Sequence, residues 1–309
     1  MRLMAADSKV YDTVIIGAGI AGLTAAMYAS RKKMKFEIIS SDFGGQFMVS
    51  GEVLNYPGII KTTGVELSMT MEEQMKFNNV NVKTETVQKV ANEGENFKVV
   101  TDKGEYSTRT VIIATGARAR KLGVPGEDRF AKKGVTYCSI CDGPLFAGKE
   151  VTVIGGGSAA LEAVDFLKDI VSKMYMLVRS DRFTGHEYLI DKVKSNPKVE
   201  VLLGAETTEI LGDKFVTGLK YTQGGKENQL DVKGVIIEIG RVPNTEAFKD
   251  TIKLDDHNHI IIDCTTATTT PGIFAAGDCA SGHEYQYVIA AGQGCMALIK
   301  AARYLANKK

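Results

Sequence analysis

Two short glycine-rich segments constrain the fold of this chain more than any other feature. The first, Gly17-Ala18-Gly19-Ile20-Ala21-Gly22, directly follows a β-branched run, Tyr11–Ile16, and precedes an alanine-rich run, Leu23–Arg31, that predicts a helix. A further strand is expected at Lys35–Ser40. This order indicates a dinucleotide-binding turn, because glycines let the backbone approach a pyrophosphate and a helix N-terminus supplies N–H groups.

The second segment, Gly155-Gly156-Gly157-Ser158-Ala159-Ala160, stands in the same context. The run Val151–Ile154 precedes it, and a helix at Leu161–Lys168 and a strand at Met174–Val178 are expected after it. In each half, a stretch of period-two alternation then ends in Val-Ile-Ile-x-x-Gly, at Val111 and again at Val235. The shared order predicts an internal duplication, that is, an α/β fold of two Rossmann-like three-layer domains.

The second domain is expected to interrupt the first. We predict a first part at 1–118, an inserted domain at 119–245 and a second part at 246–309. In the last part, strands are expected at His259–Asp263 and Ile273–Ala276, and a closing helix at about Gln286–Leu305. Asp278 follows the second of these strands, where open α/β sheets bind their ligands.

Composition excludes several classes of function. A net charge of +1 gives no electrostatic basis for binding nucleic acid or an anionic membrane. No apolar run approaches the roughly 20 residues of a membrane-spanning helix. The first residues lack the apolar core of a signal peptide, so a cytoplasmic location is predicted.

Between the two glycine segments lies Cys138-Ser139-Ile140-Cys141-Asp142, a pair of thiols followed by a carboxylate. Such a pair can close a disulfide or supply half of a zinc site. Zinc would need two further ligands, but no second CxxC exists, and no histidine (His186, His257, His259, His283) has suitable spacing. Thiol–disulfide exchange without a metal is therefore favoured. The remaining thiols, Cys264, Cys279 and Cys295, are expected to be buried and inert.

The first nucleotide site departs from the usual pattern at one position. The acid that holds a ribose is expected near Ser40, which is not acidic. Glu37 lies inside the expected strand and is predicted to point elsewhere. The Ser40 hydroxyl remains as a ribose ligand.

These motifs, together with Gly44-Gly45-Gln46, Asn55-Tyr56-Pro57-Gly58, Ala114-Thr115-Gly116, Gly240–Thr245 and Gly277-Asp278, resemble those of the low-molecular-weight thioredoxin reductases over essentially the whole chain. The resemblance implies a homodimeric FAD enzyme that reduces thioredoxin or a thioredoxin-like protein. It implies that Cys141 receives electrons from the flavin, Cys138 attacks the partner disulfide and Asp142 acts as general acid. The implied FAD contacts are Gly17, Gly19, Ile20, Ala21, Gly22, Ser40, Gly45, Gln46, Asn55, Ala114, Thr115, Gly116, Gly277, Asp278 and Gln286. Where the family often has Arg-Gln, this chain has Tyr285-Gln286.

The electron donor is left open by the second nucleotide site. The family binds NADPH with His-Arg-Arg-x-x-x-Arg, and the aligned segment here is Val178-Arg179-Ser180-Asp181-Arg182-Phe183-Thr184. Loss of two charge-assisted phosphate contacts, at roughly 1.5–3 kcal/mol each, would weaken NADPH by about two to four orders of magnitude. NADPH, NADH, a reduced protein and another hydride carrier all remain as donors. The residues expected at a nicotinamide-nucleotide site are Gly155, Gly157, Ser158, Ala159, Arg179 and Arg182.

Alternatives remain for the partner and for the activity. A glutaredoxin-like or peroxiredoxin-like partner would use the same dithiol, and a non-enzymatic redox-sensing flavoprotein would show no turnover. The trio Cys138, Cys141 and Asp142 argues against a pure binding module and against a ferredoxin–NADP reductase. Because the same cysteines must meet both a flavin and a protein, rotation of the second domain is expected, with hinges near Ala117–Lys121 and Pro243–Ala247.

Overall fold

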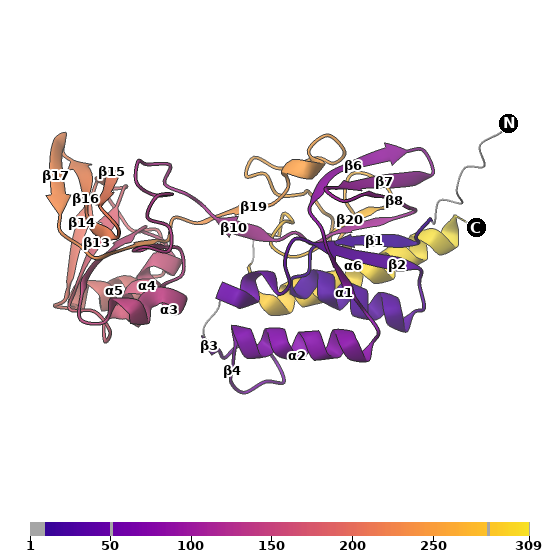
Figure 1. The fold of residues 1–309 in the computed structure, drawn as a ribbon, viewed down its shortest axis with the longest axis horizontal. Coiled ribbons are helices and arrows are strands. Elements are labelled where there is room, and N and C mark those ends of the chain that lie inside the picture. The colour runs from indigo at the N-terminus through magenta and orange to yellow at the C-terminus, as the bar shows by residue number, and fades with distance from the viewer. Residues whose placement is uncertain (1–9, 50–51, 283–284, 309) are drawn as a thin grey trace. The chain divides into compact units, whose positions relative to one another are not determined.

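The computed structural model describes residues 10–49, 52–282 and 285–308, which form two compact units (Figure 1). Unit 1 combines Met1–Arg118 with Val242–Lys309, and unit 2 is Ala119–Arg241. The chain passes between them twice, through strands β10 (Ala117–Ala119) and β19 (Arg241–Pro243), which pair as a two-stranded sheet.

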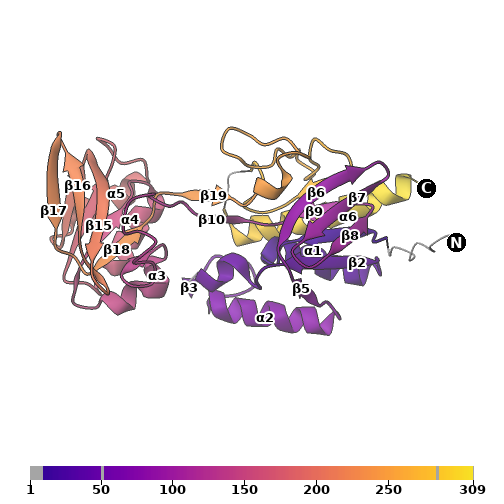
Figure 2. The same ribbon diagram turned by 45° about the horizontal axis from the view of Figure 1, so that its top comes forward.

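Unit 1 is built on a parallel five-stranded sheet. Its order is β20 (Ile273–Ala275), β9 (Val111–Ile113), β1 (Thr13–Ile16), β2 (Phe36–Ser40) and β5 (Val82–Thr84). Helices α1 (Ile20–Arg31), α2 (Gly64–Phe77) and α6 (Tyr287–Asn307) lie on one side of it. The antiparallel meander β6 (Val87–Glu93), β7 (Asn96–Thr101) and β8 (Glu105–Thr108) lies on the other side (Figures 1 and 2).

Both faces of this sheet are covered, which explains why its central strands read as continuous apolar runs. Ile15, Ile38 and Ile112 pack in one hydrophobic cluster with residues of the helices. Their neighbours along the strands, such as Ile16 and Ile113, pack in a second cluster with the meander. The alternation is that of extended strands, whose successive side chains point to opposite faces.

Helices α1 and α6 approach closely because α6 has a glycine, Gly294, at their point of contact. A Cβ added at Gly294 of α6 would overlap the carbonyl oxygen of Ala21 in α1 and lie 2.8 Å from its carbonyl carbon. Two residues earlier, an added Cβ at Gly292 would meet no atom within 4 Å. Gly294 thus sets the distance between the two helices.

Unit 2 repeats the design. Its parallel sheet has the order β11 (Val135–Thr136), β18 (Gly234–Ile237), β12 (Glu150–Ile154), β13 (Lys173–Val178) and β14 (Val199–Leu203). The helices of this unit are α3 (Ser139–Asp142), α4 (Ser158–Leu167) and α5 (Glu187–Ser195), and its meander is β15 (Ala205–Gly212), β16 (Val216–Gln223) and β17 (Lys226–Leu230). The series β9-β1-β2-β5 corresponds to β18-β12-β13-β14, so the duplication predicted from sequence is confirmed in the topology.

One predicted strand is wrong. The residues His259–Asp263 make only isolated bridges, among them Leu254 with Ile260 and Ile262 with Thr268. Carboxylates interrupt the ladder: one oxygen of Asp255 accepts from the N–H groups of His257 and His259, and one of Asp263 accepts from those of Thr265 and Ala267. Such local bonds compete with strand pairing.

Helices α2 and α5 and strand β14 are elements that the sequence reading did not identify.

No helix in the described part of the chain is long and apolar enough to cross a membrane.

Candidate functional site: a nucleotide cavity and a redox disulfide

The first glycine turn lies between β1 and α1 and requires glycine at two positions. Gly17 has a φ of +106°, and an added Cβ there would lie 2.7 Å from the carbonyl carbon of Ala114. An added Cβ at Gly22 would lie 3.0 Å from the carbonyl carbon of Gly17. By contrast, Gly19 faces open space and caps α1 without a side-chain hydrogen bond. The first N–H groups of α1 therefore face an open volume.

That volume is a cavity of about 720 Å³ in unit 1, a usual size for a cofactor site. It lies at the carboxyl ends of β1, β2, β9 and β20, where open α/β sheets bind nucleotides. Most residues predicted to contact FAD line it: Gly17, Gly19, Ile20, Ala21, Ser40, Gly45, Gln46, Ala114, Thr115, Gly116, Gly277 and Asp278.

Three of the predicted FAD contacts do not line this cavity. Gly22 packs beneath the glycine turn. The amide Nδ2 of Asn55 donates to Oε1 of Gln286 at 3.1 Å, so these two residues, far apart in sequence, contact each other. His283 and residues 1–9 lie outside the described residues.

Three acids that the sequence reading did not select line the cavity, Asp42, Glu85 and Glu246. Asp42 comes two residues after Ser40 and supplies an acid near the place where the ribose acid was expected. As predicted, Glu37 points elsewhere: its carboxylate accepts from the Tyr11 hydroxyl at 3.1 Å and lies 3.3 Å from Lys83 Nζ. Asp42 thus lies two positions beyond the place that a count of residues from the glycine turn gives.

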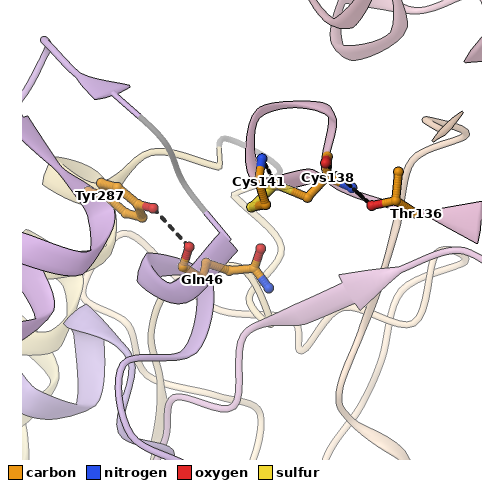
Figure 3. Close-up of a disulfide and its surroundings, with 5 residues drawn as sticks. All are labelled: Gln46, Thr136, Cys138, Cys141 and Tyr287. Atoms are coloured by element: carbon orange, nitrogen blue, oxygen red, sulfur yellow. Dashed lines mark hydrogen bonds between the residues drawn. A yellow bond between two sulfur atoms is a disulfide. The ribbon is translucent and has the colours of Figure 1, made fainter. Parts of the chain in front are cut away.

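Hydrogen bonds hold the cavity wall formed by Gln46. Its side-chain amide Nε2 donates to the carbonyl oxygen of Ala117 at 2.8 Å. Its backbone carbonyl oxygen accepts from the Tyr287 hydroxyl at 3.1 Å (Figure 3). The Tyr287 ring also packs against Phe47, with centroids 5.1 Å apart. The glycine turn, the open N-terminus of α1 and the lining acid Asp42 fit FAD, whose pyrophosphate and ribose need groups of these kinds.

The disulfide joins Cys138 and Cys141 across α3 in unit 2 (Figure 3). Cys138 begins the helix, and its Sγ accepts from the N–H of Cys141 at 3.1 Å. The N–H of Cys138 donates to Oγ1 of the buried Thr136 at 3.1 Å. Cys141 is exposed and Cys138 is half-buried. Once the disulfide is reduced, an N–H donated to Cys138 Sγ favours the charged thiolate of that residue.

Two further groups bear on this site. Asp142, the predicted general acid, is half-buried at the end of α3. The sequence reading did not select Glu238, at the end of β18. Burial raises the pKa of the Glu238 carboxyl to about 7, against the influence of Arg241 and of a hydrogen bond from the backbone of Ser139.

The second glycine turn is bonded to the loop that follows β13. The N–H of Thr184 donates to the carbonyl oxygen of Gly156 at 2.8 Å, and the N–H of His186 donates to Ser158 Oγ at 3.3 Å. An added Cβ at Gly185 would lie 2.7 Å from the nitrogen of Ser158. The loop backbone is therefore in close contact with the first turn of α4.

The aligned positions of the arginine pattern have different environments. Val178 is buried, with 1% of its surface exposed, while Arg179 and Arg182 are exposed. Ser180, which replaces an arginine, donates its hydroxyl to the carbonyl oxygen of Arg182 at 2.5 Å. Thr184 replaces the last arginine and donates to Gly156.

Of the remaining cysteines, all of which were expected to be buried, only Cys279 is fully so. Cys279 is buried and Cys295 is half-buried, but Cys264 is exposed, so the prediction of a buried thiol there is wrong. Cys264 lies in the turn that Asp263 organises, and a turn of this kind leaves its side chains in solvent. Among the described residues, no group of three or more His, Cys, Asp or Glu side chains could hold a metal ion.

The chain belongs to the pyridine nucleotide-disulphide oxidoreductase family, whose model matches residues 11–302. It is 39% identical to a thioredoxin reductase from Mycolicibacterium smegmatis, with 99% of this chain and all of that protein covered. It is 37% identical to a Bacillus subtilis NADH dehydrogenase and to a component of the alkyl hydroperoxide reductase of Escherichia coli. Both matches cover 97% of this chain, but the chain spans only 60% and 59% of those two proteins.

Solved structures agree with this grouping. A Lactococcus lactis thioredoxin reductase in the FR conformation matches with a TM-score of 0.87 at 34% identity, covering 96% of this chain and 99% of that one. The thioredoxin reductase of T. acidophilum gives 0.84 at 33% identity, covering 98% and 100%. A ferredoxin-flavin thioredoxin reductase from Clostridium acetobutylicum gives 0.54 at 29% identity, covering 96% and 98%. Within its family the chain is thus an enzyme of the thioredoxin reductase type, and its cofactor is FAD.

Proposed function

We propose that this enzyme passes electrons from FAD in unit 1, through the Cys138–Cys141 disulfide, to the disulfide of thioredoxin or a thioredoxin-like protein. The observation that carries the proposal is a disulfide across the first turn of a helix, with the Cys141 N–H donating to Cys138 Sγ at 3.1 Å. This arrangement supports Cys138 as the attacking thiolate.

The chemistry at the dithiol follows from the residues present. Bound FAD supplies two electrons at a time to the disulfide. When the S–S bond of the chain breaks, Asp142 would give a proton to Cys141, its neighbour in sequence. The Cys138 thiolate then attacks one sulfur of the partner disulfide and forms a mixed disulfide. Cys141 gives up its proton, which neutralises the first partner thiolate, and attacks Cys138 Sγ. This reforms the Cys138–Cys141 bond and releases the second partner thiolate, which takes a proton from water to complete the dithiol.

This step is tested with single serine substitutions. The flavin of Cys138→Ser and of Cys141→Ser is expected to be reduced by dithionite as in the unsubstituted protein. Neither variant should reduce thioredoxin, whose turnover is followed by the precipitation of insulin. Turnover by either variant would contradict the proposed path. A peroxiredoxin-type partner, as the relation to the alkyl hydroperoxide reductase component suggests, would show as turnover with a peroxiredoxin and none with thioredoxin.

The proposed donor is not tightly bound NADPH. Two arginines of the family pattern are replaced by Ser180 and Thr184, so neither position carries a cationic side chain for the 2′-phosphate. Both hydroxyls donate to backbone carbonyl oxygens of their own unit. The likeness to a protein named a ferredoxin-flavin thioredoxin reductase supports a reduced protein as the donor. A small reduced iron–sulfur protein would not need the 2′-phosphate contacts.

Anaerobic mixing distinguishes these donors. The flavin absorption band is followed with NADPH, NADH and a reduced ferredoxin in turn. We expect full bleaching with the reduced protein and slow, incomplete bleaching with micromolar NADPH. Complete bleaching by micromolar NADPH would refute this part of the proposal and leave the reduction of thioredoxin untouched.

We propose further that unit 2 rotates during turnover, since the dithiol serves both a cofactor and a protein. The paired strands β10 and β19 form the two connections on which such a rotation would turn. A reagent that crosslinks the two units should abolish turnover with thioredoxin. Reduction of the flavin by dithionite serves as the control and should persist. Unchanged turnover after complete crosslinking would rule the rotation out.

The assembly is proposed to be a homodimer. Helix α2 exposes Val65 and Met69 on one face, and the loop before it exposes Leu54 and Ile60. Sedimentation should give a dimer mass, and Met69→Glu should shift the equilibrium toward monomer. A monomer for the unsubstituted protein would refute this.

We also propose a cytoplasmic location, in keeping with the exposed free thiol of Cys264. Recovery of the protein only in an oxidising compartment would contradict this proposal.

A further inference from the structure

The acids that line the cofactor cavity of unit 1 outnumber its cationic side chains. The acids are Asp42, Glu85, Glu246 and Asp278. Among the described residues that line the cavity, only Arg118 has a cationic side chain. FAD carries a negatively charged diphosphate, and repulsion by nearby carboxylates disfavours its binding. Arg118 is therefore the side chain best suited to offset that repulsion.

Arg118 lies on β10, and two side chains of the segment that returns to unit 1 hold its guanidinium. Its Nη1 donates to Oδ1 of Asn244 at 2.8 Å, and its Nη2 donates to Oε1 of Glu246 at 2.6 Å. The hydrogen bond from Arg118 lowers the pKa of Glu246, which is ionised at neutral pH. A guanidinium carries more N–H donors than these two bonds use, so Arg118 can bind a further acceptor.

Asn244 is itself fixed to the end of β9. Its backbone N–H donates to the carbonyl oxygen of Gly116 at 2.9 Å, and its Nδ2 donates to that of Thr115 at 2.9 Å. Its backbone carbonyl oxygen accepts from the Thr115 hydroxyl at 2.6 Å. The guanidinium of Arg118 is thus held through Asn244 by the sheet of unit 1. Because this side chain is already ordered, it loses little conformational entropy when it binds a ligand.

The same contacts place this cluster beside the first glycine turn. An added Cβ at Gly17 would lie 3.1 Å from the Cα of Thr115. Thr115 makes two hydrogen bonds with Asn244, which in turn accepts from Arg118. All residues from Thr115 to Arg118 line the cavity that the glycine turn faces. Since a turn of this kind receives a pyrophosphate, the nearest anionic group of bound FAD is its diphosphate.

We propose that Arg118 binds the diphosphate of FAD, and that Asn244 and Glu246 are positioning residues that hold its guanidinium at the cavity wall. The contact is a charge-assisted hydrogen bond from a guanidinium N–H to a phosphate oxygen, a pairing for which the arginine fork is well suited. The inference depends on the FAD cofactor alone and holds whatever electron donor and protein partner the enzyme uses.

The first experiment measures how fast the loaded protein releases FAD. Flavin fluorescence follows the release from about 0.01 M to about 1 M sodium chloride, over which the screening length falls from about 30 Å to about 3 Å. In low salt, Arg118→Gln should release FAD at least about tenfold faster than the unsubstituted protein, because a charge-assisted bond is lost. The ratio of the two rates should shrink in high salt, since screening weakens the interaction that the variant lacks.

Two matched variants separate a phosphate contact from a structural role. Arg120→Gln removes the same charge from an exposed side chain outside the described lining of the cavity. Its release rate should stay within about twofold of that of the unsubstituted protein. Glu246→Gln keeps an acceptor for Arg118 and removes a negative charge from the cavity, so its release of FAD should be no faster than that of the unsubstituted protein.

The second experiment is phosphorus NMR of the loaded protein. The diphosphate resonances should shift in Arg118→Lys, which keeps the charge but loses the fork that Asn244 and Glu246 hold. They should not shift in Arg120→Gln. Because Arg118→Lys is a conservative change, this measurement decides the question even where Arg118→Gln does not fold.

Three results would overturn the proposal. The first is equal release of FAD from Arg118→Gln and Arg120→Gln. The second is release from Glu246→Gln as fast as from Arg118→Gln, because the ion pair would then act only as a link within the fold. The third is an unshifted diphosphate in Arg118→Lys, which would mean that Arg118 contacts another part of the cofactor, such as its adenine ring. Failure to reduce thioredoxin would bear on the proposed function and not on this inference.

Discussion

The contact between α1 and α6 at Gly294 makes a single added methyl group a strong test of the packing in unit 1. In Gly294→Ala, the new Cβ would overlap the Ala21 carbonyl oxygen and lie 2.8 Å from its carbon. Ordinary contacts of a Cβ begin at about 3.4 Å. The two helices must therefore separate, and buried residues such as Leu298 lose contacts.

Overpacking of this kind costs about 1–3 kcal/mol, and the overlap with rigid backbone on both sides places Gly294→Ala at the upper end. For a unit of this size, 1 kcal/mol shifts the melting temperature by about 2–4 °C. We therefore expect a decrease of about 4–12 °C. The matched control is Gly292→Ala on the same helix, where the exposed added Cβ meets nothing. It should increase stability by about 0.5–1 kcal/mol, because alanine favours a helix over glycine.

Melting of the flavin-loaded protein is followed by the fluorescence of released flavin, which reports on unit 1. Since Tyr287 at the start of α6 bonds Gln46 in the cavity wall, Gly294→Ala should also weaken flavin binding. A melting temperature for Gly294→Ala equal to or above that of Gly292→Ala would refute the packing argument.

Other predictions follow from buried and cavity-lining acids. Glu127 is 2% exposed and accepts from the N–H groups of Leu122 and Gly123 and from the Tyr137 hydroxyl. Glu127→Gln turns an amide N–H toward an N–H donor, so it should destabilise unit 2 by about 2–4 kcal/mol in urea unfolding. Tyr137→Phe removes one of these hydrogen bonds and should cost about 1 kcal/mol in the same measurement. The pKa of Glu85 is lowered, first by the Thr101 hydroxyl and then by Tyr106, so its stabilising effect is present above its ordinary pKa of 4.5 and is lost as pH falls through the lower folded value. Melting temperatures below pH 4.5 should accordingly fall less steeply in Glu85→Gln than in the unsubstituted protein, and parallel curves would contradict this.

The sequence was sufficient where the structure depends on backbone approach. The glycine turns were predictable because only glycine fits at Gly17 and Gly22, and the topology followed from the repeated order of elements. The sequence was insufficient where a side chain determines a turn. The carboxylates of Asp255 and Asp263 convert an apolar run into bridges, and no period in the run itself indicates this.

The acids of the two sites show a second limit. Asp42 escaped a rule based on counting residues, because it lies two residues beyond Ser40, where β2 ends, and the rule expects an acid at the strand end itself. Glu238 escaped because its raised pKa depends on its burial, which the sequence does not show. A signal for it was present all the same, since aligning the two halves of the chain sets Glu238 opposite Ala114.

The insertion of unit 2 into unit 1 has a consequence for synthesis on the ribosome. All of unit 2, Ala119–Arg241, leaves the ribosome before β20 and α6, and a domain generally folds as soon as it is complete. Helix α1 must wait for α6, more than two hundred residues later, and such distant pairings form slowly. The cysteine pair therefore reaches its folded setting before the cavity for its electron source exists. A nascent chain stalled after Arg241 should already protect unit 2 from protease while its amino-terminal segment is still digested.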